Sequence, residues 1–418
     1  MADVAPRRTS LVVLAVTVLT VTAACGVLTP DAPPPAPRVT VSPDVARAKI
    51  APPHPVPPVT FTVLAAGDLL PHGPVVRSAD GGERFDRLLA GLDPWVAGAD
   101  LALCHLEVPV APDGTAPSGY PIFGAPPGLV PALADQGWDG CSTASNHSVD
   151  RGYAGVVTTL DALDAAGMGH VGTARSHREQ SRPQRYELER SGRSLAVAHL
   201  SATYGLNGLP MPSEAPWAVD LIDTDALVRA AEKARDRGGA DVVVVSVHAG
   251  TEYTEVLTEQ QVDVAAALAA SGAVDLVIGH HAHVPQRIER LDGGPHGAGM
   301  WVAHGLGNLL SNQSASCCDA RTSSGVLLTA TITEERPSAP ALVTDVRWTA
   351  STVDIPAGHR VQVLDGSPPR STTLDRRERR VRHELVADAV GGKARERSEP
   401  PRPTGDQPTV LPRVPAGG

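Results

Sequence analysis

Aromatic residues are scarce in this chain of 418 residues, since Phe, Trp and Tyr together make up only 3% of it. Hydrophobic residues still reach 42%, so valine, alanine and leucine must supply most of a sizeable core. The chain also lacks an excess of basic charge, because its formal net charge is -10 and its pI is about 5.8. This balance argues against a general nucleic-acid-binding protein, which needs a basic face.

The only notable apolar run near the N-terminus, residues 11–21, is too short to span a bilayer comfortably. Two arginines precede this run, and two alanines stand just before Cys25. The pattern is typical of an export signal over residues 1–25, of the lipoprotein type in which Cys25 is lipidated. An ordinary cleaved signal and an uncleaved anchor are the alternatives. We therefore expect an exported protein, either lipid-anchored at the outer face of the cell membrane or secreted.

Cysteine is rare, with four residues beyond Cys25. Disulfides are possible outside the cytoplasm. Cys104 and Cys141 lie near the ends of two expected strands, so they are candidates for a pair. Cys317 and Cys318 are neighbours in the chain, and a bond between them would be strained.

The composition divides the chain into a linker, a folded domain and a tail. Repeated prolines in residues 26–58 exclude helix and packed sheet, and indicate a semi-rigid extended linker. Residues 59–355 carry the pattern of a folded domain. Residues 356–418 are polar, and we expect a largely disordered C-terminal tail with a possible short charged helix from residue 376.

The domain alternates apolar strands with amphipathic helices. Strands are expected at residues 59–66, 100–104, 140–144, 195–200, 241–247 and 274–278. Helices are expected at residues 84–96, 129–136, 153–166, 224–237 and 258–271. Continuous apolar strands between such helices predict an α/β fold with a buried, largely parallel sheet.

Five of these strands end in side chains that can bind metals. They deliver Asp68, His105 with Glu107, Asn146 with His147, His248 with Glu252, and His280 with His281 and His283. One such residue is usually part of a turn or a loop, but ligands in α/β sheets bind beyond the carboxyl ends of the strands. Five endings of this kind therefore predict one shared site. Imidazole, carboxylate and amide groups suit divalent Mn, Fe or Zn, and a pair of such ions promotes hydrolysis.

The ordered motifs resemble those of the CapA family, the bacterial capsule synthesis or poly-γ-glutamate synthesis proteins. The resemblance covers about residues 59–310 and rests on Gly67-Asp68, Leu106-Glu107, Ser145-Asn146-His147, His248 to Glu252, Ile278 to His283 and Gly307-Asn308. The family is similar to calcineurin-like metallophosphatases. The resemblance implies a four-layer α/β/β/α sandwich that holds two divalent metal ions.

The resemblance also implies roles for individual residues. The implied metal ligands are Asp68, Glu107, Asn146, His248 and two of the three histidines at 280, 281 and 283, with the pair His281 and His283 fitting the usual spacing best. His147 and Glu252 are the candidate catalytic groups, and Asn308 is a candidate contact beside the ligands.

Two positions depart from the family pattern. Position 70 is leucine where metallophosphatases usually carry histidine, and position 105 is histidine where CapA-like proteins usually carry asparagine. His72 and His105 are the candidates for replacement ligands. Without them, one metal site would be incomplete.

The leading hypothesis is a metal-dependent hydrolase or transferase that acts on capsular polymer or another cell-envelope substrate. The first alternative is a non-enzymatic component of a capsule assembly or export machine, with a degenerate metal site. The second alternative is an extracellular metal-dependent phosphoesterase. The expected partners are the polymer, the membrane through a lipid anchor, and the capsule synthesis machinery, with no nucleic acid.

Overall fold

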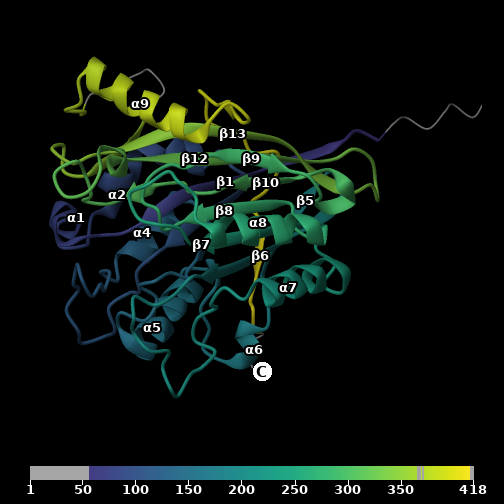
Figure 1. Cartoon of the computed structure of the whole chain (residues 1–418), viewed down its shortest axis with the longest axis horizontal. Coiled ribbons are helices and arrows are strands. Elements are labelled where there is room, and N and C mark those ends of the chain that lie inside the picture. The colour runs from purple at the N-terminus through teal and green to yellow at the C-terminus, as the bar shows by residue number, and fades with distance from the viewer. Residues whose placement is uncertain (1–55, 365–368, 370, 415–418) are drawn as a thin grey trace, which may run out of the picture. The chain divides into compact units, whose positions relative to one another are not determined.

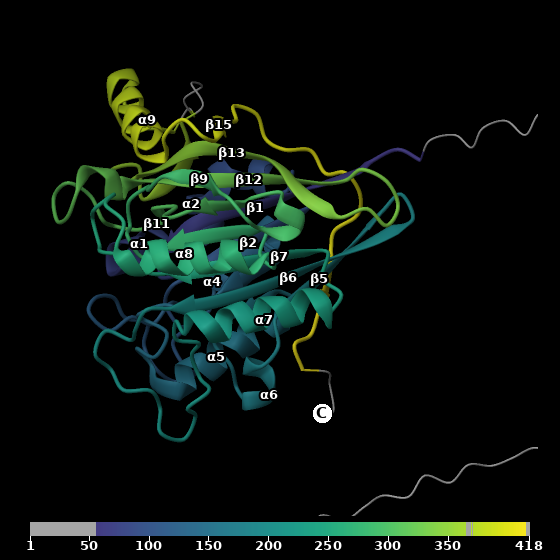
Figure 2. The same cartoon turned by 45° about the vertical axis from the view of Figure 1, so that its right-hand side comes forward.

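The computed structural model describes residues 56–364, 369 and 371–414. The predicted export signal with Cys25, and the predicted linker up to residue 55, lie outside the described residues. The rest of the domain contains two β-sheets that pack face to face, with helices on the outer faces (Figures 1 and 2).

The first sheet holds nine of the described strands, in the order β14-β13-β12-β1-β2-β3-β4, with β11 beside β1 and β15 beside β13. Strands β1 to β4 run parallel, whereas β12, β13 and β14 are antiparallel. Their bounds are β1 Val59–Leu69, β2 Leu101–Leu106, β3 Gly140–Ser142, β4 Gly169–Val171, β11 Asn308–Leu310, β12 Ser324–Glu334, β13 Ala341–Asp354, β14 Arg360–Val363 and β15 Arg395–Glu396.

The second sheet holds seven of the described strands, in the order β16-β5-β6-β7-β8-β10-β9. Its central strands β6, β7 and β8 run parallel. Their bounds are β5 Gln184–Arg190, β6 Arg193–Thr203, β7 Val242–His248, β8 Leu276–His280, β9 Ile288–Leu291, β10 Met300–Ala303 and β16 Thr409–Leu411.

Helices cover the outer face of each sheet. The first sheet is covered by α1 Gly73–Ser78, α2 Phe85–Leu89, α3 Asp93–Val96, α4 Leu129–Gln136 and α5 Gly152–Ala165. The second sheet carries α7 Thr224–Asp236 and α8 Glu259–Ser271 on its outer face, and the short α6 His177–Gln180 precedes β5. Among the described residues, three short 3-10 helices span Ala90–Leu92, Pro295–Gly297 and Ala320–Ser323.

The main core lies between the two sheets. Phe61 of β1 and Leu103 of β2 point into it from the first sheet, and Val197 and Val244 enter it from the second. β-branched residues such as the four valines at 242–245 favour extended backbone and pack well between layers. The predicted four-layer α/β/β/α sandwich is confirmed.

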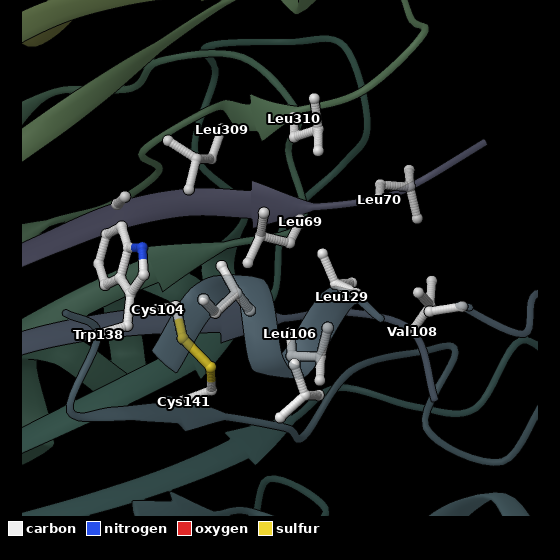
Figure 3. Close-up of a cluster of buried hydrophobic side chains, with 14 of the residues drawn as sticks. Leu69, Leu70, Cys104, Leu106, Val108, Leu129, Trp138, Cys141, Leu309 and Leu310 are labelled. Carbon is white, nitrogen blue, oxygen red and sulfur yellow. A yellow bond between two sulfur atoms is a disulfide. The ribbon is translucent and has the colours of Figure 1, made fainter. Parts of the chain in front are cut away.

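A second core lies between the first sheet and its helices. Figure 3 shows Trp138, Leu106 and Leu129 in this core, next to the disulfide that joins Cys104 to Cys141. This is the pair that the expected strand ends suggested. The structure also joins Cys317 to Cys318.

The C-terminal region differs from the prediction of a disordered tail. Its described part forms β14, β15, β16 and the helix α9 Arg376–Val390, which begins at the residue where a charged helix was expected. Val386 and Val390 of α9 are buried in the core that contains Trp348. Arg413 is only 4% exposed and donates to the carbonyl of Thr173 over 2.8 Å. The prediction of disorder was wrong because a few buried contacts, which composition does not show, hold a mostly polar segment.

Within the described ranges, no helix combines the length and the apolar character that crossing a membrane requires.

Candidate metal centre

The register of the strands brings the metal-type side chains to one edge of each sheet. In the first sheet, Asp68 of β1 pairs with His105 of β2 and with Asn308 of β11. In the second sheet, His248 of β7 pairs with His280 of β8. His105 Nε2 lies 2.9 Å from His248 Nδ1, so the two rows meet across the gap between the sheets.

Asp68, His105 and His280 form the first group, with one ligand atom of each lying within 4.8 Å of the others. Asp68 Oδ1 is 3.1 Å from His280 Nδ1. The rings of His105 and His280 stack with their centroids 3.9 Å apart. His105, the departure from the family pattern, is therefore a member of this group.

Glu107, His281 and His283 form the second group, again with ligand atoms within 4.8 Å of one another. His283 Nε2 lies 3.7 Å from Glu107 Oε1, while its Nδ1 lies 3.0 Å from Asp68 Oδ2. His283 thus touches both groups. The sequence left open which two of the three histidines bind, and the structure assigns His280 to one group and His281 with His283 to the other.

Close backbone packing allows the strand ends to converge. A Cβ atom on Gly67 would lie 2.0 Å from the carbonyl oxygen of Gly307, and one on Gly279 would lie 1.8 Å from that of His304. His281 and His283 adopt positive φ angles of 87° and 56°, which are unfavourable for residues with a side chain. Such strain commonly marks a functional site.

Glu107 provides the test of whether a metal fits. Its side chain is fully buried, and among the described residues neither carboxylate oxygen has a hydrogen-bond partner. His281 Nδ1 is also buried without a partner in the described part of the chain. Burying a polar group in this way is costly unless something binds it. A divalent cation between carboxylate and imidazole groups would satisfy these atoms, so the donor set fits such an ion.

Burial keeps most imidazoles of the centre neutral. It lowers the pKa of His105 and of His248 well below 6.5, and lowers that of His281 to about 3. Neutral imidazole is the form that binds metals.

The remaining charged groups shift in opposite directions. Burial raises the pKa of Glu107 well above 4.5. Burial also acts to raise the pKa of Asp68, but its hydrogen bonds with His280 and His283 prevail and the pKa lies well below 3.8. Burial acts to lower the pKa of His283, yet the charges of Glu107 and Asp68 raise it to about 9. Without a metal, Asp68 is therefore the ionised carboxylate and His283 the protonated ring, and a bound cation would displace the protons held on Glu107 and His283.

Asn146 and His147 lie beside the two groups. Asn146 Oδ1 accepts a hydrogen bond from His248 Nε2 over 2.8 Å. His147 Nδ1 lies 2.7 Å from Asp150 Oδ2, and that carboxylate also accepts the backbone N–H of Phe123. The sequence reasoning missed Asp150, although its position three residues after His147 could have suggested it.

A cavity of about 500 Å³ opens next to the centre. His147, His283 and Glu252 are among its lining residues. The side chain of Glu252 is 40% exposed and its Oε1 is 4.0 Å from His283 Nε2, so Glu252 lies at the rim. Tyr204 was also missed, and its ring centroid is 4.5 Å from that of His281. It directly follows β6, which was expected to end at Leu200.

Other candidates lie around the groups. Asn308 Oδ1 is 3.1 Å from His283 Nδ1 and helps to fix this ring. His72 belongs to neither group, since its Nδ1 lies 2.9 Å from the carbonyl of Leu70, and its ring lines the cavity instead. Figure 3 shows Leu70 among the apolar side chains of the outer core, where it offers no ligand. His304 Nε2 is 2.8 Å from Glu289 Oε1, outside both groups.

Relatives of known name match the region that carries these residues. The capsule biosynthesis protein CapA of Bacillus anthracis is 29% identical over 187 residues, which cover 44% of this chain and 43% of that protein. A probable polyglutamine synthesis accessory protein of Mycobacterium tuberculosis is 28% identical over 226 residues, which cover 51% of this chain and 56% of that protein. The chain thus spans about half the length of the curated relatives it matches.

Solved structures that resemble the chain include the calcineurin-like phosphoesterase YfkN from Bacillus subtilis, at 14% identity and a TM-score of 0.35, covering 71% of this chain and 91% of that one. The sulfate thiohydrolase SoxB from Thermus thermophilus has 15% identity and a TM-score of 0.37, covering 72% of this chain and 56% of that one.

The family model described as bacterial capsule synthesis protein PGA_cap matches residues 62–313, which is more than half of the chain. The match begins in β1, before Asp68, and continues past Asn308, so it includes every residue of the two groups. The chain therefore belongs to the bacterial capsule synthesis family that includes the CapA proteins.

Proposed function

We propose that this protein is a metal-dependent hydrolase or transferase of the cell envelope, acting on the amide bonds of a poly-glutamate capsular polymer or on a phosphoester bond of another envelope substrate. Membership of the capsule synthesis family supports the substrate class. The observation that carries the chemistry is Glu107, whose two buried oxygens have no hydrogen-bond partner among the described residues, beside five imidazoles.

Each of the two groups is proposed to hold one divalent ion, with Asp68, His105 and His280 around the first and Glu107, His281 and His283 around the second. Asn146 and His248 lie close enough to complete these sets. When bound, such ions acidify water and polarise the bond to be cleaved.

The His147–Asp150 pair is proposed to handle a proton. Asp150 holds Nδ1 of the ring, so Nε2, which lies 3.4 Å from Asn207 Nδ2, is the nitrogen that would give a proton to a leaving group or bind a substrate oxygen. The ring lines the cavity together with Glu252, whose exposed carboxylate is placed to contact the substrate at the rim.

Metal content of the purified full chain is the first test, measured by elemental mass spectrometry after reconstitution with Mn, Fe or Zn. We expect about two equivalents in the wild type and a loss of about one or more in Asp68→Asn and Glu107→Gln. His304→Gln is the matched control, since this histidine is also buried but lies outside both groups. Equal metal content in all four proteins would contradict the proposal.

Turnover is the second test, with poly-γ-glutamate and a phosphodiester as the two substrates. Loss of a product in Asp68→Asn and retention in His304→Gln would support hydrolysis. A metal-loaded protein that cleaves neither substrate would favour the non-enzymatic assembly component, which Leu70 supports because it occupies a position where a ligand histidine is usual.

We also propose that the protein is exported and anchored through Cys25. The support is the short apolar run with small residues before this cysteine. A Cys25→Ser variant should move from the membrane fraction to the medium and lose incorporation of labelled fatty acid. An unchanged distribution would contradict a lipid anchor.

A further inference from the structure

A second large cavity is lined by residues of α7 and of the C-terminal segment that ends the described chain. Figures 1 and 2 show where these two elements lie on the second sheet. Its volume is about 600 Å³. Leu200 of β6 and Ala234 of α7 contribute apolar surface, and Leu411 and Pro412 form part of the wall. We call this cavity the α7 groove.

The α7 groove is strongly basic, although the chain as a whole is acidic. Six of its lining residues are cationic, and none is Asp or Glu. These six residues are Arg182, Arg185, Arg229, Lys233, Arg237 and Arg413. Against a formal net charge of -10 for the chain, this local excess of one sign creates a positive potential over the groove.

Three of the six cations are committed to holding the fold. Arg413 is buried and donates through Nε to the carbonyl of Arg182, while Arg182 donates back to the carbonyl of Arg413 over 3.1 Å. Arg185 donates to the carbonyl of Gly238, just beyond the end of α7. These contacts tie the C-terminal segment and the end of α7 to the sheet.

The other three cations are free to bind a ligand. Arg229, Lys233 and Arg237 are exposed, and their side chains form no ion pair within the described part of the chain. Their neighbour Arg235, by contrast, is paired with Asp275. They recur at every fourth position, which on a helix places successive charges on one side about 6 Å apart.

We propose that the α7 groove binds an extended polyanion, namely a stretch of a poly-carboxylate chain such as the acidic polymer of the proposed function. Three positive charges spaced along one side of α7 complement a chain that carries a carboxylate on every residue, since several of these carboxylates can be paired at once. The apolar floor accommodates the methylene groups of such a chain, and the cations pair with its carboxylates.

The groove is separate from the metal centre. Arg237 lies at the end of α7 that leads into the start of β7, whereas His248 lies at the other end of this strand. The seven residues of β7 span roughly 20 Å at about 3.3 Å per residue. The groove would therefore hold the polymer at a distance from the site of reaction and raise its local concentration there.

The inference rests on the proposed function for its choice of polymer, and the experiment separates the two. Binding of a fluorescent poly-γ-glutamate oligomer to the full chain is measured by anisotropy at low ionic strength, with a chelator present so that metals contribute nothing. The test variant is Arg229→Gln, Lys233→Gln, Arg237→Gln. The matched control is Arg376→Gln, Arg377→Gln, Arg402→Gln, which removes three exposed arginines elsewhere.

We expect the test variant to bind the oligomer about tenfold more weakly and the control variant to match the wild type. Equal losses in both variants would mean non-specific attraction and would overturn the proposal. The proposal would also be overturned if the wild type bound phosphatidylglycerol vesicles more tightly than the oligomer, because the groove would then face a membrane. Asp68→Asn should lose metal but still bind the oligomer, because Asp68 lies outside the groove. That result would support binding in the α7 groove even if the proposed reaction were not observed.

Discussion

The two ends of β2 carry buried carboxylates with opposite surroundings. Asp100 immediately precedes the strand and Glu107 follows it. Asp100 receives hydrogen bonds from Arg190 over 2.9 Å, from the backbone N–H of Thr62 over 2.8 Å and from the backbone N–H of Thr404 over 2.6 Å. Both oxygens of Glu107 lack a partner among the described residues.

This contrast separates a structural carboxylate from one held for a ligand. Natural proteins satisfy almost all buried polar atoms, as the chain does at Asp100. Because the same strand positions both groups, a general defect in packing does not explain the bare oxygens of Glu107. The stability of the fold therefore depends on the Asp100 end, and the chemistry is expected at the Glu107 end.

Asp100→Asn should produce the largest loss of stability. It leaves the guanidinium of Arg190, which is 3% exposed, without its buried counter-charge. Breaking one partner of a buried ion pair typically costs about 3–5 kcal/mol. We expect a loss of this size in urea unfolding, with metal content unchanged in the folded fraction. Asp86→Asn, which breaks an exposed pair with Arg84, should leave stability unchanged. If Asp100→Asn and Asp86→Asn lowered stability equally, Asp100 would have no special structural role, and the comparison with Glu107 would fail.

Glu107→Gln should weaken metal binding, in contrast to Asp100→Asn, which should lower stability and leave metal binding unchanged. Loss of a charged ligand should weaken metal affinity by about a hundredfold, roughly 2.7 kcal/mol, while Asp100→Asn leaves it intact. Titration with Zn or Mn, followed by calorimetry, measures this difference. If Asp100→Asn weakened metal binding and Glu107→Gln did not, the assignment of the metal centre would be contradicted.

The metal-bearing end could be predicted from the sequence because its signal is local. An apolar run followed directly by Asp, Glu or His marks a strand end, and parallel strands bring such ends together. This reasoning found Asp68, Glu107 and His248. It failed at Tyr204, because β6 extends three residues beyond the expected end at Leu200.

The hydrogen bonds at the Asp100 end of β2 could not be predicted, because the residues that make them are remote in the chain. Thr404 reaches Asp100 across 304 positions, and no pattern near either residue indicates the contact. The same reason explains why the C-terminal region was predicted to be disordered. The α7 groove was missed too, since Arg413 is remote in the chain from the cations of α7 and lies beside them only in the folded structure.

Without metal, Glu107→Gln should stabilise the protein at high pH. Burial raises the pKa of Glu107 in the folded state, so the folded apoprotein holds this proton more tightly than the unfolded chain does. The stability of the wild type should therefore fall as pH rises from about 4.5 through the raised pKa, whereas the variant lacks this slope. At pH 8 with a chelator, we expect the variant to be more stable by about 1–3 kcal/mol. If the difference in stability between the wild type and the variant were the same at pH 5 and at pH 8, this prediction would be contradicted.

The smallest expected loss of stability concerns the contact between Thr404, in the C-terminal segment, and Asp100. Thr404→Val removes the hydroxyl that donates to Asp100 Oδ1 over 2.9 Å and accepts from Arg190 Nε over 2.9 Å, but keeps the backbone N–H that donates to the same carboxylate oxygen. Because Asp100 retains its other donors but two hydrogen bonds are lost, the protein should lose about 1–2 kcal/mol of stability. Thr409→Val, at an exposed position of β16, is the matched control and should cost less, since valine suits a strand. If the two substitutions cost the same, the Thr404 hydroxyl adds nothing, and Asp100 would be satisfied by Arg190, Thr62 and the backbone alone.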